Sequence, residues 1–179
     1  MASQLTVDNI VGATTAGKIH IPGHVVNVQS ANYTGTMQES SNSFVDITDL
    51  SITMTPASAN SKFLVSCAIA ASASFNFSFL RIVRNGTQIV QNDSVGNRST
   101  GHFGFQSYDS NDAGWDMRYL PAQLLDAPNI TSNVTYKVQF CSRSDTGVAY
   151  INKTPRDTNN SNGYDARGVS TLTVMEIAQ

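Results

Sequence analysis

The segment Val134-Thr135-Tyr136-Lys137-Val138-Gln139-Phe140 alternates strictly between apolar and polar side chains. Because successive side chains of a β-strand point to opposite faces, this alternation predicts a strand that is buried on one face only. The buried face would carry Val134, Tyr136, Val138 and Phe140, whereas Lys137, Gln139, Cys141 and Arg143 would lie on the outer face. A strand of this kind is typical of an antiparallel sheet that covers a core.

Similar runs lie on both sides of this segment and are separated by short stretches rich in Gly, Asn, Asp and Pro. Short strands with such turn residues between them are typical of a β-sandwich or a barrel. No long stretch repeats apolar residues with helical spacing, so we expect an all-β fold. The predicted strands are residues 24–29, 44–47, 50–54, 61–73, 75–84, 87–90, 102–107, 133–143, 149–153 and 169–177, and residues 115–125 form either a strand or an irregular crossing.

The pair Asn85-Gly86 separates two of these runs, residues 80–84 and 87–90. Both residues tolerate the positive φ angles of a type I′ turn, which matches the twist of the flanking strands. The pair therefore predicts a two-residue β-hairpin.

The N-terminal residues 1–23 differ from the rest of the chain. A strand-like run, Leu5 to Val11, is broken by a Gly- and Thr-rich stretch before Ile19-His20-Ile21-Pro22. No face of this segment is wide enough for a core of its own, so its backbone needs partners from elsewhere. We expect an extended attachment arm at residues 1–23 and one domain at residues 24–179. The arm residues expected to bind a partner are Leu5, Val7, Ile10, Val11, Ile19 and Ile21.

The composition narrows the class of protein. The 179 residues are 40% hydrophobic and 13% charged, with a formal net charge of −2 and no basic patch, which argues against nucleic acid as a partner. No run is apolar enough to span a membrane, and we expect no membrane insertion. The N-terminus lacks a charged region followed by an apolar stretch, so we expect no secretory signal and maturation in the cytoplasm where the chain is made.

The two cysteines are predicted to remain free thiols. Strand alternation places Cys67 on the inner face with Phe63, Val65 and Ile69, and Cys141 on an outer face. Synthesis in a reducing compartment also disfavours a disulfide. No base stands near either residue in the sequence, so neither is expected to act as a nucleophile.

Several phrases, taken in order, resemble the fibre and virion structural proteins of tailed bacteriophages, particularly marine, cyanophage-like ones. These phrases are residues 5–10, 21–26, 43–56, 61–65, 135–139 and 170–177. The resemblance implies an antiparallel, jelly-roll-like β-sandwich, displayed on the outside of a virion and often trimeric. Together with the unpartnered arm, it leads us to expect a homotrimer that contacts other virion proteins of the tail or capsid.

The resemblance leaves two placements open. In the first, the protein is a short tail fibre, whose arm docks to the tail and whose loops touch the host surface, with a glycan as the expected ligand. In the second, it is a capsid decoration (cement) protein, whose arm and domain clamp capsid subunits. Either role requires assembly in the host cytoplasm and a final location on the virion.

Four residues are candidates for receptor binding: Tyr108, Trp115, Tyr164 and Arg167. An aromatic ring with a polar tip suits the flat apolar face of a sugar ring. The alternative, which we favour for Trp115, is that its side chain plugs one end of the sandwich. Tyr108 and Tyr164 lie in polar loops, which suits a binding role better.

The sequence gives no catalytic residues, no cofactor site and no metal site. Asp109 to Gly114 begins like a calcium loop, but Ala113 and Leu120 stand where oxygen ligands are needed. Residues 157–163 are better explained by a hairpin turn. His20 and His24 are separated by Pro22-Gly23, which prevents the helical spacing that would bring them together. We expect a protein without enzymatic activity.

Overall fold

The computed structural model describes residues 11, 21–74, 77–91, 93, 96–106, 114–143, 147–159, 161 and 163–179. These residues form eleven β-strands and no helix, so the all-β prediction is confirmed. The strands are β1 (Val25–Tyr33), β2 (Met37–Glu39), β3 (Val45–Met54), β4 (Lys62–Ser74), β5 (Phe77–Arg84), β6 (Thr87–Gln88), β7 (Phe103–Gln106), β8 (Arg118–Asp126), β9 (Val134–Ser142), β10 (Val148–Ile151) and β11 (Ser170–Ile177).

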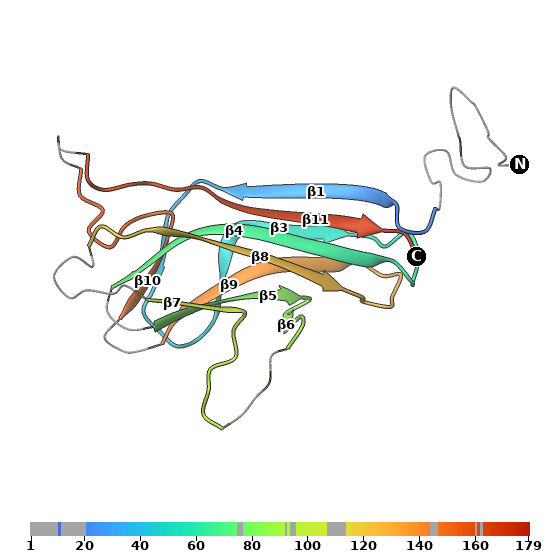
Figure 1. Cartoon of the computed structure of the whole chain (residues 1–179), viewed down its shortest axis with the longest axis horizontal. Helices are drawn as coiled ribbons and strands as arrows, with labels where there is room; N and C mark the ends of the chain where they lie inside the picture. Colours follow the sequence, from blue (N-terminus) through green and yellow to red (C-terminus); the bar gives the residue numbers. More distant parts are fainter. Residues whose placement is uncertain are drawn as a thin grey trace, which may run out of the picture.

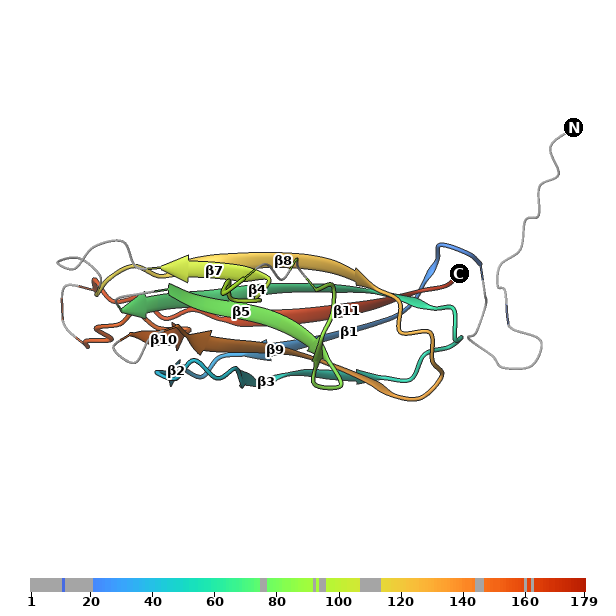
Figure 2. The ribbon, with the colours of Figure 1, turned by 90° about the horizontal axis from the view of Figure 1, so that it is seen from below.

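The strands form two antiparallel sheets in a sandwich-like arrangement (Figures 1 and 2). The larger sheet runs in the order β1-β11-β4-β10-β2, and β8 pairs with the other edge of β4. The smaller sheet runs in the order β3-β9-β5-β6, and β7 also pairs with β5. Strand β4 is the centre of the larger sheet because β8 pairs along one edge while β11 and then β10 pair along the other.

The core lies between the two sheets and combines residues from both. The predicted inner face of β9 is confirmed, since Val134, Tyr136, Val138 and Phe140 are all buried. Tyr136 meets Phe63 of the larger sheet at a ring-centroid distance of 5.6 Å. Buried aromatic pairs of this kind contribute most of the apolar area that a small core removes from water.

The Tyr136 hydroxyl, which the core would otherwise leave without a partner, donates to Asp126 Oδ2 at 2.8 Å. Arg84 donates to the same oxygen at 2.6 Å. Because Asp126 belongs to β8 and both donors to the smaller sheet, this contact ties the two sheets together. Burial, followed by the hydrogen bond to Asp126, raises the pKa of Tyr136.

The Asn85-Gly86 hairpin is confirmed. Asn85 and Gly86 have φ angles of 49° and 83°, and Val83 and Arg84 pair with Gln88 and Thr87 across the turn. Asn85 also accepts the Thr135 N–H through its side chain at 2.8 Å, which fixes the turn to β9.

One prediction about the strands was wrong, and one strand was missed. Residues 44–47 and 50–54 belong to one strand, β3, which changes register between Asp46 and Ser51, and Asp49 has a φ of 61° there. The short strand β2 was not predicted, because three residues are too few to show an alternating pattern.

Both cysteines are free thiols, as predicted. The outer position of Cys141, however, does not leave it in solvent, because its side chain is only 3% exposed. It lines a cavity of about 260 Å³ together with Phe44, Phe79 and residues 98–100, which lie over this end of β9. Burial raises the pKa of the Cys141 thiol, and that of Cys67 rises to about 11 for the same reason.

The two ends of the sandwich differ. At one end, which we call the base, the chain enters β1 beside the C-terminus, and Gly23 N–H donates to the Ala178 carbonyl at 2.8 Å. Strand β10 and the connection that follows it lie at the opposite end, which we call the tip (Figures 1 and 2). Of the predicted arm contacts, Val11 and Ile21 are exposed, and Leu5, Val7, Ile10 and Ile19 lie outside the described residues. In the described part of the chain, no helix has the length and apolar character needed to cross a membrane.

Candidate functional site at the tip

The tip is built on the connection between β10 and β11. An isolated antiparallel bridge between Lys153 and Arg167 closes this connection at its neck. We call residues 154–166 the tip loop, and its described residues are 154–159, 161 and 163–166. The loop is predominantly polar, as the sequence suggested.

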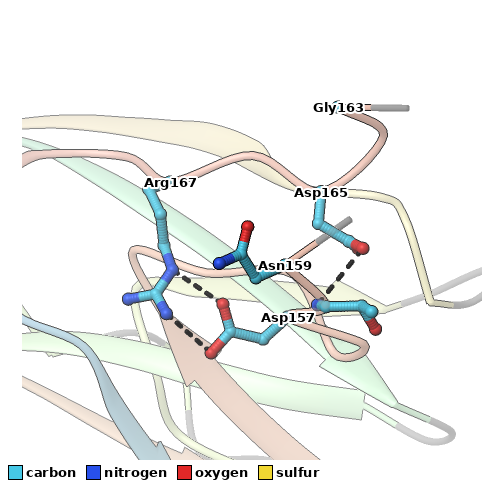
Figure 3. Close-up of a pocket in the computed structure, with 6 residues that line it drawn as sticks. Asp157, Asn159, Gly163, Asp165 and Arg167 are labelled. Carbon is cyan, nitrogen blue, oxygen red and sulfur yellow. Dashed lines mark hydrogen bonds and ion pairs between the residues drawn. The ribbon is translucent and has the colours of Figure 1, made fainter. Parts of the chain in front are cut away.

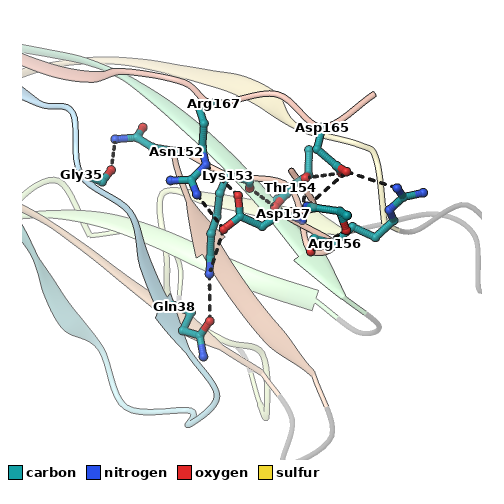
Figure 4. A network of polar contacts seen from close by, with 11 residues as sticks. Gly35, Gln38, Asn152, Lys153, Thr154, Arg156, Asp157, Asp165 and Arg167 are labelled. Carbon is teal, nitrogen blue, oxygen red and sulfur yellow. Dashed lines mark hydrogen bonds and ion pairs between the residues drawn. The ribbon is translucent and has the colours of Figure 1, made fainter. Parts of the chain in front are cut away.

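Buried Asn152 holds the neck of the tip loop in place. Its side-chain amide donates to the Gly35 carbonyl at 2.9 Å (Figure 4) and to the Tyr33 carbonyl at 2.7 Å. Its Oδ1 accepts from Ser170 Oγ at 2.7 Å. Its backbone N–H donates to the Ala70 carbonyl at 2.8 Å. Asn152 has a φ of 60°, a conformation that asparagine tolerates better than most residues. The side chain of Asn152 thereby fixes the loop to β11 and to the end of β1, and its backbone N–H fixes it to β4.

A polar pocket of about 440 Å³ opens in the tip loop (Figure 3). It is lined by Asp157, Thr158, Asn159, Gly163, Asp165 and Arg167. Arg167, the predicted contact residue, forms a two-point ion pair with Asp157, with Nε–Oδ1 and Nη2–Oδ2 distances of 2.7 and 2.9 Å. This planar pair lies in the wall of the pocket.

Lys153, Arg156 and Arg167, the described cations of the tip loop and its neck, each have a carboxylate partner (Figure 4). Lys153 and Arg167 both pair with Asp157, and Arg156 pairs with Asp165 at 3.3 Å. Asp165 also accepts from Thr154 Oγ1 at 2.9 Å and from the Thr158 N–H at 3.2 Å. The charged residues that line the pocket are therefore two carboxylates, Asp157 and Asp165, and one guanidinium, Arg167, which is already paired with Asp157.

An aromatic surface adjoins the tip loop. Trp115 and Tyr164 face each other with ring centroids 6.0 Å apart and an interplanar angle of 38°. The Arg156 guanidinium lies 5.1 Å from the centre of the Trp115 ring, and its backbone N–H donates to the Gly114 carbonyl at 3.2 Å. These contacts join the segment before β8 to the tip loop.

The expectation that Trp115 plugs one end of the sandwich is wrong, because its side chain is 47% exposed and Tyr164 is 61% exposed. The tip loop supplies Arg156 and Tyr164 as its neighbours, so the ring lies on the surface rather than between the sheets. Of the four predicted receptor residues, the structure brings Trp115 and Tyr164 into contact and puts Arg167 in the same loop system. Tyr108 lies outside the described residues.

Sequence reasoning missed several residues of this site, namely Arg156, Asp157, Asn159 and Asp165. It grouped them only as a polar turn, because an Asn- and Asp-rich stretch is by itself typical of turns. A usable signal was the clustering of two arginines with two aspartates inside the single connection between β10 and β11, residues 152–169, which is long for a simple turn.

The described residues contain no group of three or more His, Cys, Asp or Glu side chains arranged to hold a metal ion. His102 has a structural role and links two segments of the smaller sheet. Its Nδ1 accepts the Ile82 N–H at 2.9 Å, and its Nε2 lies 2.6 Å from the Ile89 carbonyl. A neutral ring protonated at Nε2 satisfies both contacts and ties the segment before β7 to β5.

In comparisons with known proteins, no family model and no curated protein matches this chain.

Proposed function

We propose that this chain is a non-enzymatic surface protein of a tailed-phage virion, of the short tail-fibre kind, which attaches through residues 1–23 and binds a host-surface glycan with its tip. The phage assignment rests on the sequence resemblance. The geometry adds one supporting observation, which is that the exposed Trp115–Tyr164 pair and its polar pocket lie at the end opposite the entry of the N-terminal segment. Attachment and recognition therefore do not compete for the same surface.

The chemistry of the tip suits a pyranose ring. The faces of Trp115 and Tyr164 can cover the apolar C–H face of a sugar, and the exposed edges of Asp157, Asn159 and Arg167 can hydrogen-bond its hydroxyls. The paired Arg167 and Asp157 present donors and acceptors side by side, which matches two neighbouring hydroxyl groups.

The charges favour a neutral sugar over an acidic one. Because Lys153, Arg156 and Arg167 already contact carboxylates, a negatively charged sugar would have to displace an ion pair or approach Asp157 and Asp165. A neutral sugar meets no such opposition.

A glycan array probed with the full chain tests this proposal. We expect binding to neutral pyranose glycans, and its loss in Trp115→Ala. Phe77→Ala is the matched control, because Phe77 is a similarly exposed aromatic residue of the smaller sheet that does not line the tip pocket. Binding that is equal in wild type and Trp115→Ala would remove the tip as the recognition site.

A truncation that starts at Gly23 tests the role of the arm. We expect a folded domain that no longer attaches to virions, because Gly23 N–H and His24 O, which bond to Ala178, are retained. Unfolding of this variant would assign the arm to the core instead.

We further propose that the two-sheet fold is a jelly-roll-like β-sandwich. The support is that successive strands repeatedly change sheet, since β3, β5 to β7 and β9 belong to one sheet and the others to the second.

The placement on the virion is tested by the number of copies per particle, measured by quantitative mass spectrometry against the major capsid protein. We expect few copies, as for a tail component. Hundreds of copies would favour the capsid decoration role and overturn the tail placement.

A further inference from the structure

The outer face of the larger sheet carries an apolar row that crosses four strands. The strand register aligns Val28 of β1 with Met175 of β11, Met175 with Leu64 of β4, and Leu64 with Leu125 of β8. Val28 and Leu125, at the two ends of the row, are 53% and 50% exposed. Monomeric proteins seldom leave such a continuous apolar strip in water.

The next two rows toward the tip carry no charge either, whereas the row on the base side of the strip includes Lys62, which pairs with Ile177. The first consists of Ser30, Thr173, Ser66 and Gln123, and the second of Asn32, Thr171, Ala68 and Pro121. Several of the polar groups bond to each other within the sheet: Ser30 Oγ and Thr173 Oγ1 are 3.1 Å apart, and Gln123 Nε2 donates to Ser66 Oγ at 3.1 Å. We call these twelve residues the uncharged face.

The outer face of the smaller sheet is different. Asp46 accepts from Lys137 and from Gln139, each at 2.6 Å, and Arg81 donates to the Gln139 side chain at 2.7 Å. The Arg81 guanidinium also lies over the Phe44 ring at 4.0 Å. This face is a charged, hydrogen-bonded network of the kind that stays in water.

We propose that the uncharged face is covered by the same face of a second copy of this chain. Charge complementarity decides the occupant, because a charged partner surface would lose its hydration against twelve residues that offer no counter-charge. The uncharged face of another copy meets this condition, whereas the charged outer face of the smaller sheet does not. Two identical faces also bring apolar row against apolar row in a closed, symmetric contact.

The uncharged face is separate from the tip, which is the proposed recognition surface, and from the base, where the chain enters β1. The four strands that carry it run along the long axis, between the base and the tip (Figure 2). A contact along this axis covers neither the Trp115–Tyr164 pair nor the point where the chain enters β1. The proposal does not depend on what the tip binds.

Sedimentation equilibrium of the full chain, over micromolar concentrations, tests the proposal. We expect a mass of two chains for the wild type, because a symmetric contact between two copies of one face closes as a dimer. In Leu125→Lys, each contact would bury an unpaired ammonium group, and we expect the association to weaken by roughly tenfold or more. Ser51→Lys is the matched control, because it adds the same charge at an exposed position of the smaller sheet, and its mass should equal that of the wild type.

Circular dichroism and thermal unfolding show whether each variant is folded. A folded Leu125→Lys protein that associates as strongly as the wild type would overturn the proposal, as would a monomeric wild type. If the wild type is monomeric and removal of residues 1–20 makes it associate, the N-terminal segment of the same chain is the occupant, and the proposal is wrong.

Discussion

Two polar networks lie close to the neck of the tip loop, one around Asn152 and one around Asp157 and Arg167. They use similar kinds of side chain, but one is buried and the other is open to water. Around Asn152, the side-chain amide and carbonyl are buried and bonded to Tyr33, Gly35 and Ser170. A few residues later, Asp157 and Arg167 form an equally close pair that is open to water and lines a pocket. The comparison teaches that hydrogen bonds alone do not mark a recognition surface; the proposal for the tip rests on the exposure of its polar pair beside two exposed aromatic rings.

Substitutions in the two networks should therefore change the free energy of unfolding by different amounts. A buried polar group that loses its partner costs far more than an exposed ion pair, because water cannot replace the partner. We expect changes around Asn152 to alter stability, and changes at the tip to alter recognition while stability is nearly preserved.

The largest effect is expected for Asn152→Ala. The change leaves the carbonyl of buried Tyr33 without its side-chain donor, at about 1–3 kcal/mol, removes the part-buried bond to Gly35 as well, and puts alanine at a φ of 60°. We expect the free energy of unfolding to fall by roughly 3–5 kcal/mol in urea denaturation.

Asn129→Ala is the control for this change, because Asn129 has a similar φ of 55° but is exposed. It should lose only about 1–2 kcal/mol, the part that comes from backbone conformation. Equal losses in the two variants would mean that the buried hydrogen bonds of Asn152 contribute little.

The next largest effect is a dependence of the free energy of unfolding on pH, which comes from the buried side chains of Cys67 and Tyr136. The pKa of Cys67 is raised to about 11 and that of Tyr136 is raised as well, so the folded chain keeps protons that the unfolded chain releases. Their contribution is fully present below about pH 9 and is lost as the pH rises, by up to about 1.4 kcal/mol per pH unit for each group.

Unfolding in urea between pH 7 and 11 measures this slope. We expect Cys67→Ala to reduce it, whereas Trp115→Ala, which removes no titratable group, should leave it as in the wild type. A slope that is the same in the wild type and in Cys67→Ala would contradict the assignment to the buried thiol.

A smaller effect on stability is expected for Asp157→Asn. The pair with Arg167 is largely exposed on the arginine side, and exposed pairs contribute at most about 1 kcal/mol. Thermal unfolding should therefore shift little, while glycan binding weakens because the charge pair in the pocket wall is lost. A loss of stability as large as that of Asn152→Ala would erase the distinction between the two networks.

The sequence predicted the parts of the fold that depend on neighbouring residues. Alternation identified β9 and its buried face, and Asn85-Gly86 identified the hairpin, because both signals are local. The sequence pattern wrongly divided β3 into two strands, because the change of register near Asp49 looks like a turn in the sequence. Antiparallel sheets were therefore predictable, and their irregularities were not.

The candidate site was predictable only in part. Tyr164 and Arg167 were chosen because they lie in a polar loop, but their neighbours were not, since Trp115 approaches from a segment about fifty residues earlier. The same holds for Asn152, whose partner Tyr33 lies 119 residues away. Cys141 was expected on an outer face of its strand, but its burial there was not predictable, because the residues that line the cavity beside it come from distant segments.

The most direct test of the account is a paired measurement on Tyr164→Ala, which removes the most exposed ring of the tip. Thermal unfolding and binding of the labelled full chain to host cells would be measured on the same protein samples. We expect an unfolding midpoint close to that of the wild type and binding to host cells reduced by roughly tenfold or more, as for the loss of an aromatic anchor. Unchanged binding, or a loss of binding that only accompanies unfolding, would contradict the assignment of the tip as a recognition surface.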